Sequence, residues 1–247
     1  MNHPLLLLLM TAAGLYVGKL WRDDRRAVRA GQANPQGLPG ATEAPGRAVV
    51  IAVAGALAIL AAETWGELAL GLAGEQSRMT WLFAAYSVAA APLIEELIFR
   101  GWLVVDGKGR AWRWAGAVGA SVGFAALHPF LWRWDDAGFA LTPGAKGWFS
   151  TAVVFATSLW FYAARLAAWN PQRSLLPCFA AHGAKNLGVV AVKLAAGFMG
   201  PIWQGSGRSR RGGGSALRGK RRGGAMGKRA PPAKKGRAGE ARPKDGR

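Results

Sequence analysis

The chain has 247 residues, 51% of them hydrophobic, and a formal net charge of +19. Its apolar residues stand in long uncharged runs such as 48–62, whereas a soluble domain of this length buries them in short amphipathic pieces. A single cysteine, Cys178, excludes a disulfide framework and a four-cysteine zinc site. The sequence also contains no P-loop and no dinucleotide-binding fingerprint. Composition therefore favours a membrane protein.

Six segments of the chain are predicted to cross a membrane as helices. About 20 mostly apolar helical residues cross a bilayer core, and in chain order the candidates are 4–18, 48–72, 79–105, 114–132, 148–169 and 175–203. The last could be two pieces, giving seven helices, because Gly197, Gly200 and Pro201 interrupt it. A spanning segment must satisfy its own backbone hydrogen bonds. The predicted fold class is therefore all-α, a polytopic membrane helix bundle.

The loops between these segments differ in charge. The first, third and fifth loops hold eleven Lys and Arg, if Arg165 near the end of the fifth segment is included, and the second and fourth hold three. Basic residues are enriched in cytoplasmic loops, so the odd-numbered loops are predicted to be cytoplasmic. We expect an integral, multi-pass protein of the cytoplasmic (inner) membrane of a bacterium.

The end of the chain, 205–247, has a different composition. It holds fifteen Lys and Arg against two acids, so it carries +13 of the net charge, and it has too few apolar residues to fold. We predict a disordered basic tail. It is either an arm for anionic lipid or nucleic acid or a solvated extension that need not be native protein. We favour the second interpretation, so a nucleic-acid partner is not expected.

The third segment carries an informative set of ionisable side chains, because charges inside a bilayer normally face the bundle interior. Glu96 and Arg100 are four residues apart, so they share a helix face and can pair. Glu95 points about 100° away and has no local partner. A carboxylate of this kind in a low-dielectric surrounding accepts a proton readily, as a general base must. Pro92 removes a backbone hydrogen bond and predicts a kink that admits water.

Two later segments supply further polar groups. His128 is in the fourth segment, and His182 and Asn186 are four residues apart in the last, so that they project together. One carboxylate, two imidazoles and an amide form a plausible water-activating and oxyanion-binding set. Each of these residues alone could instead make an interhelical hydrogen bond. Lys185 is expected to extend to the membrane surface.

Three motifs occur in a fixed order: Glu95-Glu96-x-x-x-Arg100, Phe124-x-x-x-His128 and His182-x-x-x-Asn186. In this order they resemble the motifs of the CPBP family (CAAX proteases and bacteriocin-processing proteins, also called the Abi family). That family includes the type II CAAX prenyl proteases and the lysostaphin-resistance-like proteins. The resemblance covers roughly residues 79–200 and implies a glutamate-dependent intramembrane endopeptidase.

The resemblance also implies roles for the motif residues. Glu95 and His128 would polarise a water for attack on the scissile carbonyl, and His182 and Asn186 would stabilise the oxyanion. Glu96 and Arg100 would hold the architecture of the site. The family was long classed as metalloendopeptidases, but this chain has no His-Glu-x-x-His helix. We predict no cofactor, and leave open a zinc site formed by Glu95, His128 and His182.

The predicted organisation is N-terminal membrane helices in 1–78, a CPBP-like catalytic core in 79–204, and the tail in 205–247. The expected substrate is a membrane-embedded or lipid-modified protein or peptide. One rival function is a non-enzymatic membrane scaffold or bacteriocin-immunity protein, which would not need Glu95. Another is a proton-linked transporter. The chain has no second copy of the Glu-Glu-x-x-x-Arg segment, and transporters often contain paired repeats.

Overall fold

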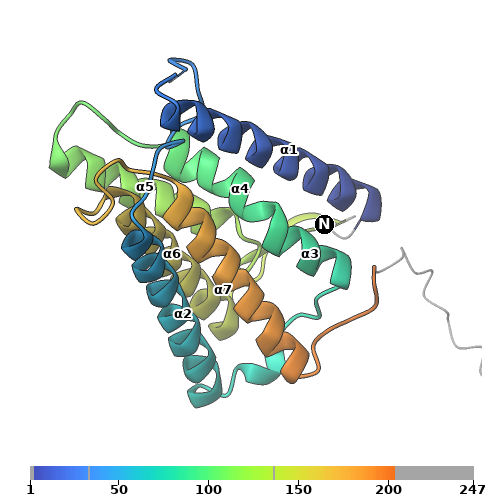
Figure 1. Cartoon of the computed structure of the whole chain (residues 1–247). Coiled ribbons are helices and arrows are strands. Elements are labelled where there is room, and N and C mark those ends of the chain that lie inside the picture. Colours follow the sequence, from blue (N-terminus) through green and yellow to red (C-terminus); the bar gives the residue numbers. More distant parts are fainter. Residues whose placement is uncertain (1–2, 33, 136, 204–247) are drawn as a thin grey trace, which may run out of the picture. The chain divides into compact units, whose positions relative to one another are not determined.

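A computed structural model describes residues 3–32, 34–135 and 137–203; the predicted tail lies outside these ranges. The described residues form a bundle of helices with one small sheet (Figure 1). In chain order the elements are α1 (Pro4–Arg29), α2 (Gly46–Ala69), the 3-10 turn η1 (Ala73–Glu75), α3 (Trp81–Ala89), α4 (Ala91–Glu96), the π-helical turn η2 (Leu97–Trp102), α5 (Arg110–Leu127), β1 (Trp132–Asp135), β2 (Gly138–Leu141), α6 (Ala145–Leu166) and α7 (Leu176–Ala195). The predicted helical bundle is confirmed.

Each predicted membrane segment is helical, and the third is divided into α3, α4 and η2. Among the described residues, four stretches are long and apolar enough to cross a membrane, namely α1, α2, the combined Trp81–Trp102 stretch and α6. The protein is therefore a polytopic helical membrane protein. α5 and α7 do not meet both conditions, length and apolar composition. That they cross the membrane stays a prediction.

Several helix ends differ from the prediction, and local chemistry explains them. α1 continues to Arg29 because its charged end is paired, with Lys19 Nζ 2.7 Å from an Asp23 carboxylate oxygen one turn later. α5 stops at Leu127, and His128 is extended (ψ 127°), as is usual before a proline. α7 ends at Ala195, two residues before Gly197, whose positive φ of 75° ends the helix at the predicted interruption.

The helices pack in pairs that are distant in sequence. α2 lies along α7, α5 along α6, and α1 against α3 and α4 (Figure 1). The two N-terminal helices belong to the same compact unit as the helices that follow. A β-carbon on Gly14 would lie only 2.7 Å from Ala90 Cβ, so α1 approaches α3 and α4 closely because it has no side chain there.

The first, third and fifth loops meet at one end of the bundle. The Leu175 amide donates a 3.0 Å hydrogen bond to the Gly40 carbonyl, and the Thr42 hydroxyl donates one of 2.9 Å to the Gln172 carbonyl. Arg173 Nη1 lies 3.0 Å from the Asp106 carboxylate. The odd-numbered loops therefore share one face, as their charge asymmetry predicts.

The sheet between α5 and α6 is a finding that the sequence did not predict. Antiparallel pairing of Trp132 with Leu141 and of Trp134 with Phe139 places these four side chains on one face of a hairpin. The predicted membrane segment 114–132 instead extends a helix as far as Trp132, the first residue of β1. The alternation of aromatic and polar residues around a Gly138 with φ 101° is compatible with a short hairpin.

Candidate active site

The site begins at a break in the third membrane segment. α3 ends at Ala89, Ala90 has φ −118° and ψ −41°, and α4 starts with Pro92 in its first turn. The kink predicted from the proline is thus present. Beside the break, the Asn186 side-chain amide on α7 donates a 2.7 Å hydrogen bond to the Ser87 carbonyl. The break therefore offers a backbone carbonyl to a side chain from another helix.

Glu96 and Arg100 form the predicted ion pair. Arg100 Nη1 lies 3.2 Å from Glu96 Oε1, and both side chains are completely buried. Each side chain therefore supplies the opposite charge that the other needs inside the bundle. Arg100 belongs to the π-helical turn η2, and π-turns are often found at functional sites.

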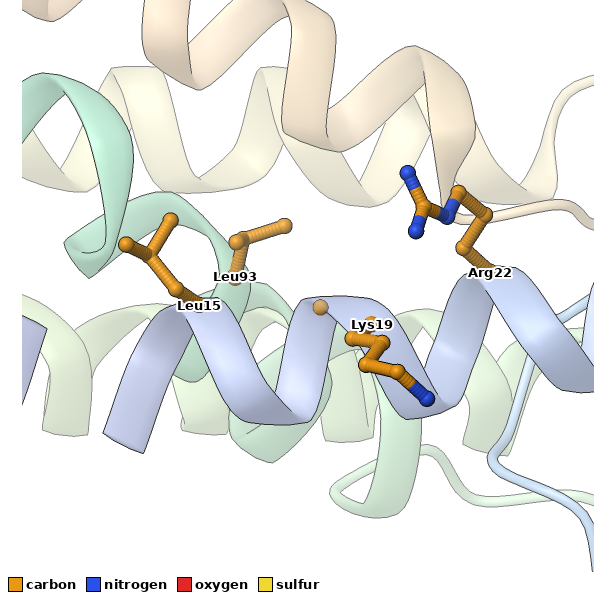
Figure 2. Close-up of a pocket in the computed structure, with 5 residues that line it drawn as sticks. Leu15, Lys19, Arg22 and Leu93 are labelled. Carbon is orange, nitrogen blue, oxygen red and sulfur yellow. The ribbon is translucent and has the colours of Figure 1, made fainter. Parts of the chain in front are cut away.

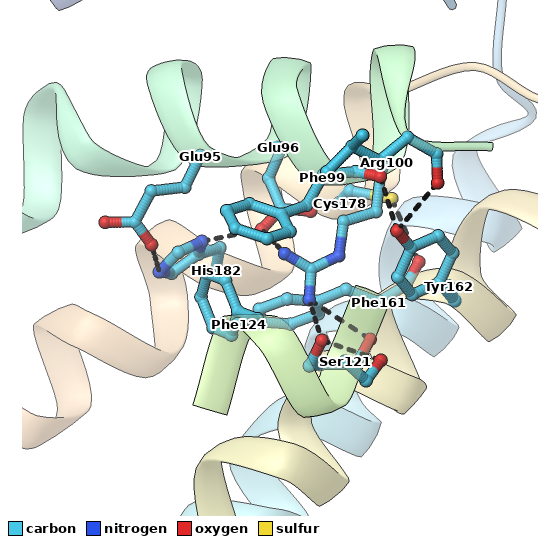
Figure 3. Close-up of polar contacts among 12 residues, drawn as sticks. Glu95, Glu96, Phe99, Arg100, Ser121, Phe124, Phe161, Tyr162, Cys178 and His182 are labelled. Carbon is cyan, nitrogen blue, oxygen red and sulfur yellow. Dashed lines mark hydrogen bonds and ion pairs between the residues drawn. The ribbon is translucent and has the colours of Figure 1, made fainter. Parts of the chain in front are cut away.

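Arg100 is held by groups from two further helices (Figure 3). Its Nη2 donates hydrogen bonds to Ser158 Oγ at 2.5 Å and to the Ser158 carbonyl at 3.2 Å, and Ser158 Oγ donates to Ser121 Oγ at 2.8 Å. Four rings surround the guanidinium carbon, with centroids at 4.6 Å for Phe124, 5.1 Å for Tyr162, 5.4 Å for Phe161 and 5.8 Å for Phe99. Hydrogen bonds and aromatic faces together compensate a buried cation.

Removing the Ser158 hydroxyl should destabilise the protein. We expect Ser158→Ala to lower the free energy of unfolding by about 1–3 kcal/mol, because a buried charged donor loses the nearer of its two acceptors. Thermal unfolding of the purified protein in detergent measures the effect. Thr151→Ala on the same helix is the control, because its hydroxyl bonds only the Gly147 carbonyl of its own helix. An equal loss in both variants would contradict a specific role for Ser158.

His182 lies between the two glutamates (Figure 3). Its Nδ1 is 2.8 Å from Glu96 Oε1, and its Nε2 is 3.8 Å from Glu95 Oε2. An ionised carboxylate only accepts, so Nδ1 carries the hydrogen that Glu96 receives. The ring also stacks on Phe161, with centroids 5.1 Å apart. Glu96 and Phe161 thereby orient the imidazole so that Nε2 faces Glu95.

The other two candidate residues have different contacts. His128 Nδ1 donates to the Phe124 carbonyl at 2.8 Å, and its ring contacts the Phe124 and Phe130 rings. In the described part of the chain, His128 and Asn186 form no hydrogen bond or ion pair with Glu95 or His182. The structure brings Glu95, Glu96, Arg100 and His182 together. Asn186 instead bonds the Ser87 carbonyl beside the helix break.

The zinc alternative can be compared with the same geometry. Among the residues that the structure describes, no three His, Cys, Asp or Glu side chains gather closely enough to hold a metal ion. Glu95, His128 and His182 thus do not form a ready ligand set here, and we derive no step through a metal.

Some residues around the site were missed or misread in the sequence. The sequence analysis did not single out Ser121 and Ser158, whose hydroxyls bond each other. Both are polar residues within apolar segments, and that is the signal that could have identified them. Lys185 was expected to extend to the membrane surface, but it is buried and its Nζ lies 2.8 Å from Glu63 Oε2. That expectation was wrong because the partner lies 122 residues away in sequence.

Comparison with known families agrees with the geometry. Residues 77–188 match the family of type II CAAX prenyl endopeptidases described as Rce1-like. This part of the chain belongs to the CAAX-protease (CPBP) family. A search of curated proteins and a search of solved structures each found no match.

The CAAX-protease domain contains the whole candidate site. It extends from just before α3 into α7, and so includes every motif residue from Glu95 to Asn186. α1 and α2 lie outside the matched range, although they pack against the domain. The Glu63 partner of Lys185 is thus contributed by a helix outside the family match.

Proposed function

We propose that the protein is an intramembrane endopeptidase that hydrolyses a peptide bond with a water activated by Glu95 and His182. Family membership supports an endopeptidase of the CAAX-protease type. The observation that carries the catalytic assignment is the 3.8 Å separation of Glu95 Oε2 and His182 Nε2. This distance is too long for a direct hydrogen bond, but a water beside the two atoms could contact both.

The proposed chemistry needs one water and one proton relay. Glu95 accepts a proton from the water, while His182 Nε2 accepts a hydrogen bond from it. The water oxygen then attacks the scissile carbonyl carbon and forms a tetrahedral intermediate. Glu95 returns the proton to the leaving amide nitrogen, and the carbon–nitrogen bond breaks. Glu96 and Arg100 position His182 and do not touch the reacting atoms.

Asn186 and His128 would act on the substrate from the neighbouring elements. One N–H of the Asn186 amide is used by the Ser87 carbonyl, which leaves the second N–H for the developing oxyanion. The Phe124 carbonyl occupies Nδ1 of His128, so the Nε2 of a neutral ring is left as an acceptor. His128 therefore suits contact with the water or the leaving group better than with the oxyanion.

The proposed substrate is a membrane-associated protein or peptide with a hydrophobic or lipid-modified segment. Glu95 is reachable, with 28% of its side chain exposed, whereas Glu96 is fully buried. A substrate held in the membrane could therefore meet Glu95 without displacing the Glu96–Arg100 pair. We propose the cytoplasmic membrane of a bacterium as the location.

Cleavage of a fluorogenic hydrophobic peptide by the protein in liposomes tests this function. We expect His182→Ala to lose at least about a hundredfold in kcat/KM, because Glu95 loses its partner on the water. His3→Ala is the matched control, because His3 precedes α1 and touches no site residue. Retained cleavage in His182→Ala would refute the assignment. Loss of cleavage on adding a strong chelator would instead favour the zinc alternative, and pH-linked flux without cleavage would favour a transporter.

A further inference from the structure

A groove between α1 and α4 shares no residue with the proposed active site. It has a volume of about 240 Å³ and is lined by Leu15, Gly18, Lys19 and Arg22 of α1 and by Leu93 of α4 (Figure 2). The α1 residues are spaced three and four apart, so they form one stripe along the helix. From this arrangement we infer that the groove binds an anionic phospholipid.

The position of the groove follows from the contact between the two helices. A β-carbon on Gly18 would lie 2.6 Å from Leu93 Cδ1, so α1 and α4 touch where α1 lacks a side chain. The groove lies beside this contact, with Leu15 on one side of Gly18 and Arg22 on the other. Close packing at a glycine therefore leaves a recess flanked by longer side chains.

The two ends of the groove differ in polarity. Leu15 and Leu93 form an apolar end, and Lys19 and Arg22 form a basic end (Figure 2). Leu15 and Arg22 are separated by seven helical residues, which is about 10 Å along the axis. Each headgroup layer adds roughly 5–8 Å to the hydrocarbon core. A phospholipid with its chain beside the leucines would thus place its phosphate near Lys19 and Arg22.

The charge of the basic end favours an anionic headgroup. Arg22 forms no ion pair among the described residues, and Lys19, whose side chain is 59% exposed, shares its charge with Asp23. Arg26 and Arg29, further along α1, are paired with Asp23 and Glu43, so Arg22 and Lys19 supply the positive charge at this end of the groove. A Lys or Arg near an anionic membrane surface contributes about fivefold in binding. Two such residues correspond to about thirtyfold.

Lipid retention measures this binding directly. The full chain is purified in detergent, incubated with dioleoyl-phosphatidylglycerol or dioleoyl-phosphatidylcholine, and analysed by native mass spectrometry. We expect one phosphatidylglycerol to be retained in preference to phosphatidylcholine. The double variant Lys19→Gln/Arg22→Gln should weaken phosphatidylglycerol retention by about ten- to thirtyfold. Because bound lipid and not cleavage is measured, the result is independent of the proposed enzymatic activity.

Two further variants separate a groove from general attraction to a basic surface. Arg26→Gln/Arg47→Gln removes two charges from the same end of the bundle outside the groove and should leave retention unchanged. Leu15→Trp keeps both charges but fills the apolar end, and should reduce retention of the lipid. Equal loss in the two double variants, equal retention of both lipids by the unmodified chain, or full retention by Leu15→Trp would overturn the inference.

Discussion

Glu95→Gln should lower the rate of peptide hydrolysis by between about a hundredfold and ten-thousandfold, the range usual for loss of a general base. Glutamine keeps the size of the side chain but cannot accept the proton of a water. Because Glu95 is partly exposed and makes no short contact, the substitution should leave folding intact. The measurement is kcat/KM for a hydrophobic peptide in liposomes.

The control for this substitution is Glu75→Gln. Glu75 lies in the exposed turn η1, outside the candidate site, so this variant removes the same charge without touching the chemistry. Its activity should equal that of the unmodified protein. Cleavage by Glu95→Gln at the control rate would show that another group activates the water, or that the protein is a scaffold in which Glu95 is dispensable.

Arg100→Met is expected to cause the largest loss of stability. Arg100 and Glu96 are both fully buried, and Arg100 Nη1 is 3.2 Å from Glu96 Oε1. Removing one partner of a buried pair leaves an uncompensated charge and typically costs about 3–5 kcal/mol. We expect a loss of this size in the free energy of unfolding in detergent, together with loss of cleavage, because Glu96 no longer orients His182.

A double variant separates stability from positioning. In Glu96→Gln/Arg100→Met both charges are removed, so the protein should be more stable than Arg100→Met alone. Cleavage should nevertheless stay low in the double variant, because it lacks the Glu96 carboxylate that accepts the His182 Nδ1 hydrogen. A double variant with restored cleavage would contradict the positioning role of Glu96.

Local spacing made part of this site predictable. The Glu96–Arg100 pair and the kink at Pro92 follow from residues within one or two helical turns, and both are present. The six helical segments follow from apolar runs. The bounds of α1 were less accurate, because the charges after Gly18 looked like a helix end although they form pairs along the helix.

Contacts between distant segments could not be predicted in this way. The contact of His182 with Glu96 joins residues 86 positions apart, and the Arg100–Ser158 contact joins residues 58 apart. Helical spacing indicated that His182 and Asn186 share a face, but it could not show that Asn186 would bond the Ser87 carbonyl. Lys185 was misjudged for the same reason, since only the packing of α2 on α7 brings Glu63 to it.

Hydrolysis in heavy-oxygen water tests the central claim most directly. The protein in liposomes is incubated with one hydrophobic peptide in labelled water, and the products are analysed by mass spectrometry. If Glu95 and His182 activate a water in the membrane domain, the new carboxyl group will carry one labelled oxygen, and Glu95→Gln will yield almost no product. Labelled product at an unchanged rate from Glu95→Gln, or no cleavage of any peptide by the unmodified protein, would contradict the proposed mechanism.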